Sequence, residues 1–99
     1  MKEKFERVST TFVQDLRIAD MFGQQAIKET FDNVVESWLD DVEYFTEFVV
    51  ALNQLCWFHY ENGRHDIGML YSELFYKARN LGYDTYKGAE LDHFYSVIE

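Results

Sequence analysis

The sequence predicts an all-α protein, a small bundle of about four helices, on three observations. The 99 residues include no proline and only five glycines, so nothing interrupts long helices. Hydrophobic residues make up 47% of the chain, which is enough for one packed core in a domain of this size. They recur at intervals of three and four, the spacing of one helical face. Residues 1–99 are therefore expected to form a single helical domain.

The N-terminal segment, residues 1–18, has the weakest helical pattern. Its run VSTTFV contains β-branched residues, so an irregular or extended segment is expected, packing Phe12 and Ile18 on the bundle. A frayed helical turn at KEKFER is the alternative. The start of the chain is charged and lacks an apolar run of about 7–15 residues, so no signal peptide is expected. No apolar stretch reaches the roughly 18 residues that span a bilayer, so no membrane contact is expected either.

The first helix with a clear periodic pattern is expected over residues 20–39. Apolar residues from Phe22 to Trp38 share one face, and acidic residues occupy the opposite face. Asp40 and Asp41 then form a turn and an N-cap, because a carboxylate accepts hydrogen bonds from the free amides of a helix start.

The second helix, residues 42–62, carries two apolar stripes, one from Phe45 to Tyr60 and one from Tyr44 to Phe58. A helix that is apolar on two faces should lie between others, so it is placed at the centre of the bundle. Its remaining stripe is acidic but includes Trp57, which bundle packing is expected to cover. An exposed Trp57 would instead anchor an interface.

The last two helices are expected over residues 67–81 and 89–98. The glycine of Asn62-Gly63 can end the preceding helix, because glycine accepts the left-handed conformation after a last turn. Asp66 is expected to cap the third helix and Gly82 to end it, with a loop through YDTYKG following.

Cys56, His59, His65 and Asp66 are candidate metal ligands, since zinc favours such side chains. A structural zinc site needs four ligands in recognised pairs, and no second cysteine exists. Cys56 also completes an apolar stripe, so a buried core cysteine is the favoured interpretation. The single cysteine cannot form an internal disulfide, which is typical of a reducing cytoplasm. No metal and no cofactor are expected.

Repeat and enzyme classes are also disfavoured. The stretch HYENGRHDIGMLYSELFYKA resembles one tetratricopeptide helical pair, but such solenoids need about three stacked units. The sequence contains no phosphate-binding glycine loop, nucleophile elbow or His-Glu-x-x-His motif. The chain is therefore expected not to be an enzyme.

The acidic residues are concentrated in one third of the chain. Eight acids and no Lys or Arg lie between Glu29 and Gly63, and the whole chain has a net charge of −9. This field should repel nucleic acid and attract a basic partner, although plain solubility is an alternative explanation. The residues expected to bind a partner are Glu29, Asp32, Glu36, Asp40, Asp41, Glu43, Glu47 and Trp57.

Most of the chain after residue 10 resembles a group of small, uncharacterised proteins encoded by bacteriophages and prophages of gut-type bacteria. The resemblance lies in TTFVQDLRIADMFGQQAIKETF, YFTEFVVALNQLCWFHYE, LYSELFYKA and YKGAELDHFYSVIE. It implies a phage-encoded protein in the cytoplasm of the bacterial host, and carries no site residues with it. The purely acidic segment after Phe31 departs from the more basic pattern expected of relatives.

Two functional hypotheses follow. In the first, the protein inhibits a basic, nucleic-acid-handling host-defence protein, such as a CRISPR effector, by docking its acidic surface on it. In the second, it is a non-catalytic accessory phage protein that forms a helical homo-oligomer such as a homodimer, with surplus aromatic residues pairing the subunits.

Overall fold

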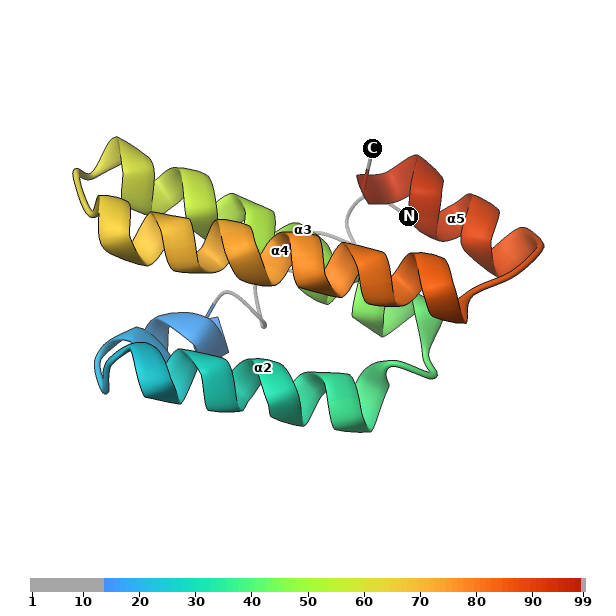
Figure 1. The fold of residues 1–99 in the computed structure, drawn as a ribbon, viewed down its shortest axis with the longest axis horizontal. Helices are drawn as coiled ribbons and strands as arrows, with labels where there is room; N and C mark the ends of the chain where they lie inside the picture. The colour runs from blue at the N-terminus through green and yellow to red at the C-terminus, as the bar shows by residue number, and fades with distance from the viewer. Residues whose placement is uncertain (1–13, 99) are drawn as a thin grey trace.

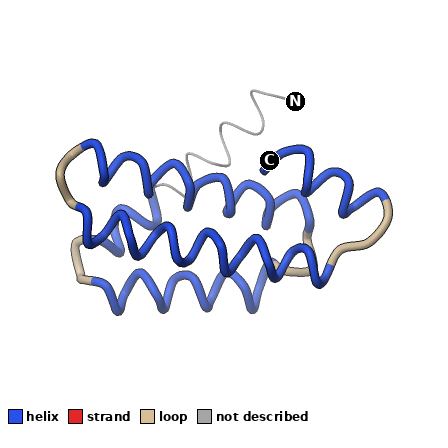
Figure 2. The backbone as a smooth tube through the Cα atoms, turned by 45° about the horizontal axis from the view of Figure 1, so that its top comes forward, coloured by secondary structure: helices blue, strands red, loops and turns tan. Residues whose placement is uncertain are grey.

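The computed structural model describes residues 14–98, which consist of helices joined by short turns (Figure 1, Figure 2). A helical segment over residues 14–20 precedes α2 (Gln24–Trp38), α3 (Val42–Glu61), α4 (His65–Thr85) and α5 (Ala89–Ile98). The all-α prediction is confirmed over residues 14–98, which form five helices where about four were expected in the chain. Within residues 14–98, none of the helices combines the length and apolar character that crossing a membrane requires.

The expectation of an irregular or extended N-terminal segment is wrong for residues 14–18, which are helical. Leu16 and Ala19, three residues apart, are buried in the core, whereas Ile18, expected to pack on the bundle, is 57% exposed. The β-branched run ends at Val13, and the residues after it follow helical periodicity, which decides their conformation. Phe12 lies outside the described residues.

The helix expected from residue 20 is broken by a turn over residues 21–23. Gly23 has a φ of 104°, in the left-handed region that only glycine adopts readily, so the chain reverses there before α2 begins. Phe22, expected on the core face, therefore lies in this turn and is 78% exposed, and Trp38, expected on the same face, is the last residue of α2 and is 40% exposed. The buried residues of α2 are Ile27 and Phe31.

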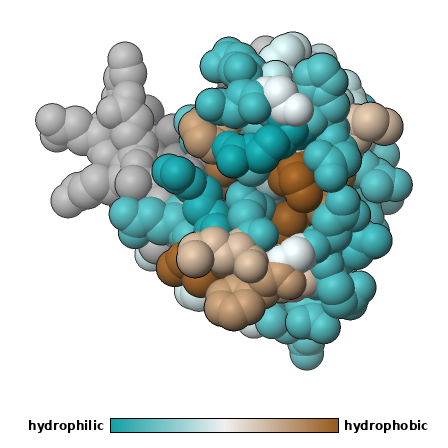
Figure 3. Space-filling view, turned by 90° about the vertical axis from the view of Figure 1, so that its left-hand side faces the viewer, coloured by the Kyte–Doolittle hydropathy of each residue, from teal (hydrophilic) through white to brown (hydrophobic). Residues whose placement is uncertain are grey.

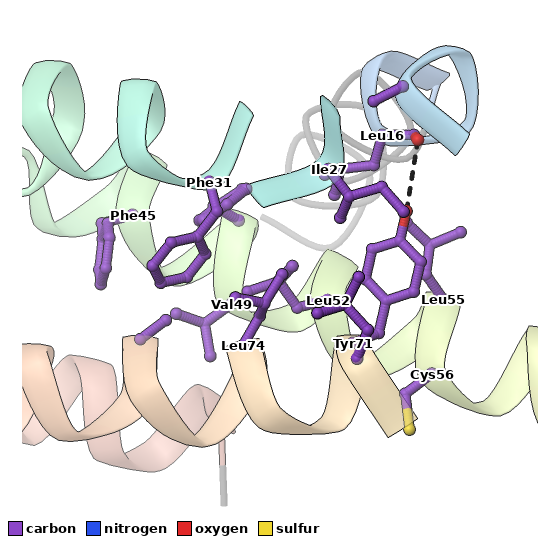
Figure 4. Packing of buried hydrophobic residues seen from close by; sticks show 14 of the residues in the cluster. Leu16, Ile27, Phe31, Phe45, Val49, Leu52, Leu55, Cys56, Tyr71 and Leu74 are labelled. Carbon is purple, nitrogen blue, oxygen red and sulfur yellow. Dashed lines mark hydrogen bonds between the residues drawn. The ribbon is translucent and has the colours of Figure 1, made fainter. Parts of the chain in front are cut away.

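Helix α3 contributes ten buried residues and packs against α2, α4 and α5. Figure 4 shows Phe31 of α2 and Leu74 of α4 meeting the α3 side chains Val49 and Leu52 in one apolar cluster. At the other end of α3, Phe45 stacks on Phe94 of α5 with ring centroids 6.4 Å apart. Burial of this apolar area supplies the main favourable term for folding.

The ends of α3 follow the sequence prediction. The side chain of Asp41 accepts a hydrogen bond from the backbone N–H of Tyr44 at 3.2 Å, which is the expected N-cap. Asn62 is the C-cap, and Gly63 follows with a φ of 75°. Helix α5 also has the bounds that the sequence predicts.

Helix α4 is longer than predicted at both ends. Arg64, and not Asp66, occupies its N-cap position, and no side chain caps it. Gly82 does not end the helix: it is buried inside it, and a Cβ built there would lie 2.3 Å from a ring carbon of Phe94. Gly82 is therefore the point at which α5 approaches the backbone of α4, and this close approach explains why glycine stands there.

Candidate interaction surface

Four acidic residues extend along α2 and into the turn that follows it. Glu29, Asp32 and Glu36 are exposed and spaced by three and four residues, which places them on one face of the helix. Asp40, also exposed, follows in the turn between α2 and α3. We call Glu29, Asp32, Glu36 and Asp40 the acidic α2 surface.

The corner between α2 and α3 adds further charge and two aromatic rings. Glu43 is exposed in the first turn of α3, whereas Asp41 is half-buried and already engaged as the N-cap. Trp38 and Tyr44 pack against each other across the corner with ring centroids 4.8 Å apart, and each is 40% exposed. The corner therefore presents an aromatic pair beside carboxylates.

Tyr86 reports the electrostatics of this corner. Its hydroxyl donates a hydrogen bond to the backbone carbonyl of Leu39 at 2.6 Å, which ties the loop before α5 to the α2–α3 turn. Burial, together with the carboxylates of Glu90, Asp41 and Asp40, raises the pKa of Tyr86 well above its ordinary value. The carboxylates of Asp40, Asp41 and Glu90 are therefore close enough to the Tyr86 hydroxyl to disfavour its ionised form.

Glu47, one of the residues expected to bind a partner, is not on the exposed acidic surface. Its side chain is 6% exposed, and Thr46 beside it is fully buried. Helical periodicity places Glu47 on the outer stripe of α3 with Glu43, but tertiary packing covers Glu47 and leaves Glu43, one turn earlier, exposed. Asn53, Gln54 and Trp57, farther along the helix, are exposed.

Trp57 is 60% exposed, so the expectation that packing covers it is wrong. Its ring lies 6.2 Å from that of Tyr60. It lies fourteen positions after Glu43, which is about 21 Å along the helix at 1.5 Å per residue. Trp57 therefore lies near the opposite end of α3 from the acidic corner, and the two belong to different parts of the surface.

Cys56 is buried, as predicted for a core cysteine. Burial, opposed by a weaker hydrogen-bonding effect of Ser72, raises the pKa of its thiol. The other candidate ligands do not gather around it, and among residues 14–98 no group of three His, Cys, Asp or Glu side chains is arranged to hold a metal ion.

His59 instead belongs to a buried polar cluster that the sequence did not reveal. Its Nε2 lies 3.0 Å from one carboxylate oxygen of Asp20, and the hydroxyl of Tyr71 donates to the other at 2.5 Å. The rings of His59 and Tyr71 stack with centroids 5.4 Å apart. The Tyr71 hydroxyl also lies 3.3 Å from the carbonyl of Leu16 (Figure 4). Burial and the Asp20 carboxylate raise the pKa of Tyr71 well above its ordinary value.

This Asp20–His59–Tyr71 cluster joins three parts of the chain that lie 39 and 51 residues apart in sequence. Periodicity relates residues only within one helix, so no sequence pattern pointed to it. The cluster fastens the helical segment 14–20 to α3 and α4.

Comparison of the chain with models of known protein families, with curated proteins and with solved structures found no match.

The exposed acids should make the folded protein sensitive to salt. We expect sodium chloride at about 0.2 M to raise the melting temperature by about 4 °C relative to low salt, because it screens their mutual repulsion. Differential scanning fluorimetry measures this shift. A melting temperature that is unchanged or lowered by salt would show that neighbouring cations already compensate the carboxylates.

Proposed function

We propose that the protein is a non-catalytic interaction protein that binds a basic partner through the acidic α2 surface and the adjoining corner. The observation that carries this proposal is the exposure of Glu29, Asp32, Glu36, Asp40 and Glu43 in a stretch of sequence that contains no Lys or Arg. Such a field attracts positive surfaces and accelerates their association.

The spacing of these carboxylates favours a partner that normally grips nucleic acid. Side chains three or four residues apart on a helix lie about 5–6 Å from one another at Cβ. Phosphates along a nucleic-acid strand repeat on the same scale, with an axial rise of about 3.4 Å. A groove lined with Lys and Arg for phosphates can therefore accept the carboxylates of α2 in their place.

The aromatic pair at the corner supports a specific contact rather than a diffuse one. Large aromatic side chains ringed by polar groups supply much of the binding energy in protein interfaces. Trp38 and Tyr44 have this setting, since Asp40 and Glu43 stand beside them in sequence and both are exposed. In this proposal the carboxylates steer the partner and the aromatic pair anchors it.

The resemblance to phage-encoded proteins supplies the biological setting of the proposal. The partner is then a basic host-defence protein in the bacterial cytoplasm, a CRISPR effector or another nucleic-acid-binding protein, and the outcome of docking is inhibition. Blocking a groove needed for nucleic acid requires no catalysis and no cofactor.

Capture from a bacterial lysate at two salt concentrations tests this proposal. The immobilised protein should retain a basic protein at about 50 mM salt and release it at about 500 mM, because screening removes the attraction between exposed charges. Added DNA or RNA should compete for the captured protein. Retention that is insensitive to both salt and nucleic acid would contradict the proposal.

A second candidate function, a helical homo-oligomer, is favoured by the large apolar side chains away from the acidic surface. Trp57, Met69 and Phe22 are each at least 60% exposed. These residues could pair copies of the chain without involving the carboxylates of α2.

Trp57→Ala separates these alternatives. Because Trp57 is exposed, the change should alter the free energy of unfolding by no more than about 0.5 kcal/mol. Sedimentation velocity should show weaker self-association if the chain oligomerises through this surface. Capture of a basic partner at the distant acidic corner should be unaffected. A large loss of stability would assign Trp57 to the core instead.

A further inference from the structure

A hollow of about 440 Å³ lies where the 21–23 turn approaches the end of α3 and the start of α4. This volume is in the range of about 300–1,000 Å³ that small-molecule sites occupy. Figure 3 looks onto this end of the molecule and shows apolar residues along one edge and inside a recess bordered by hydrophilic ones. The residues that matter here are Arg17, Met21, Phe58, His59, Arg64 and Ile67.

Two arginines that line the hollow both lie over the ring of Phe58. The guanidinium carbon of Arg17 lies 5.1 Å from the ring centroid of Phe58, and that of Arg64 lies 5.4 Å from the same centroid. The two guanidinium carbons therefore lie at most 10.5 Å apart. Stacking on an aromatic face restrains a guanidinium while its N–H groups remain able to donate hydrogen bonds.

Neither arginine has a carboxylate partner among the described residues, although the chain holds 18 acidic and nine basic residues. Asp20 lines the same hollow, but its two oxygens are engaged by His59 and Tyr71. Two like charges on one ring repel each other, and an anion placed between them would offset that repulsion.

The inner wall of the hollow contains a second unpartnered group. His59 lines the hollow and is 3% exposed. Its Nε2 carries the proton shared with Asp20, because a carboxylate only accepts. Its Nδ1 is buried and has no hydrogen-bond partner in the described part of the chain. Such orphaned buried atoms are uncommon. In this tautomer Nδ1 is an acceptor, so a ligand would satisfy it with a donor group, and Nδ1 does not itself hold an anion.

We propose that this hollow binds a small organic anion. Its carboxylate or phosphate group lies between Arg17 and Arg64, and its aromatic or aliphatic body lies against Phe58, Ile67 and the exposed Met21. Guanidinium groups bind both acidic groups through paired, charge-assisted hydrogen bonds, and the apolar wall selects against inorganic ions. The site lies at the opposite end of α3 from the acidic corner and does not depend on docking there.

Titration of the full chain with two probes tests the site, with amide chemical shifts as the readout. Phenyl phosphate and 3-phenylpropionate each combine an acidic group with an aromatic body. At least one of them should bind saturably, with the largest shifts at residues 17–21 and 58–67. Inorganic phosphate and benzyl alcohol each lack one of the two features and should bind about tenfold more weakly. The stronger of the two main probes identifies the acidic group that the site prefers.

Substitutions of the two arginines test whether they contribute to the affinity for the probe. Arg17→Gln and Arg64→Gln should each weaken the better probe by about tenfold. Lys87→Gln removes an equal charge from an exposed position in the loop before α5 and should leave affinity unchanged. Arg17 and Arg64 are exposed, so thermal melting should show all three variants folded. Saturation by neither probe, or equal binding in the arginine variants, would overturn the proposal.

Discussion

Replacing Asp20 by alanine is expected to lower the free energy of unfolding by about 2–3 kcal/mol. The change removes the acceptor of two hydrogen bonds at once. His59 keeps a buried Nε2–H with nothing to receive it, and Tyr71 keeps only the 3.3 Å contact with Leu16. Leaving a buried donor unsatisfied costs more than the hydrogen bond itself contributes.

Asp15→Ala is the matched control, because Asp15 is an exposed acid on the same helical segment. Its effect should stay within about 0.5 kcal/mol. Tyr71→Phe removes one hydroxyl and leaves the Asp20–His59 contact, so an intermediate loss of about 1 kcal/mol is expected. Urea denaturation measures all three. Equal losses for Asp20→Ala and Asp15→Ala would show that the cluster contributes nothing to stability.

Gly82→Ala should destabilise the protein by about 2 kcal/mol although alanine is the better helix former. The new Cβ would lie 2.3, 2.4 and 2.9 Å from three ring atoms of Phe94. Phe94 cannot move aside easily, because it is fully buried and its ring packs against Phe45, Tyr83 and Tyr86. The strain therefore exceeds the roughly 1 kcal/mol gained in helix propensity.

Gly68→Ala provides the comparison within the same helix. Its Cβ would lie 3.2 Å from the Tyr60 ring and 3.3 Å from the backbone carbonyl oxygen of Cys56, contacts that small shifts relieve, so the change in stability should stay within about 1 kcal/mol. A double variant, Gly82→Ala with Phe94→Leu, should be less destabilised than the sum of its single variants, because leucine vacates the space. Additive losses would place the strain elsewhere.

Helix positions were predictable wherever local chemistry and periodicity agreed. Asp41 caps the start of α3, and Gly63 follows its end in a left-handed conformation. Both residue types can be recognised in the sequence as helix-end signals. The prediction at Gly82 was wrong because a glycine after an apolar stripe is consistent with two structures, a helix end or the close approach of another helix. Only the position of Phe94, contributed by α5, distinguishes them.

The candidate site was predictable in part. The acids of α2 are exposed because that helix buries only Ile27 and Phe31 and leaves its other face open. Glu47 could not be assigned correctly, since its burial depends on packing around the first half of α3. The Trp38–Tyr44 pair was also missed, because Trp38 matched the core spacing and its place at the end of α2 was not evident.

The most direct test of acidic docking is the association rate of the captured partner with a charge-reversal variant. The variant replaces Asp32, Glu36 and Asp40 together by lysine. These three residues are exposed and none of them caps a helix, so the fold should survive. The control replaces Asp66, Glu73 and Asp84, exposed acids of α4, and changes the net charge equally. At low salt the first variant should associate at least about tenfold more slowly than the native protein, and the control should associate nearly normally. A folded Asp32/Glu36/Asp40 variant that associates as fast as the control would contradict docking through the acidic α2 surface.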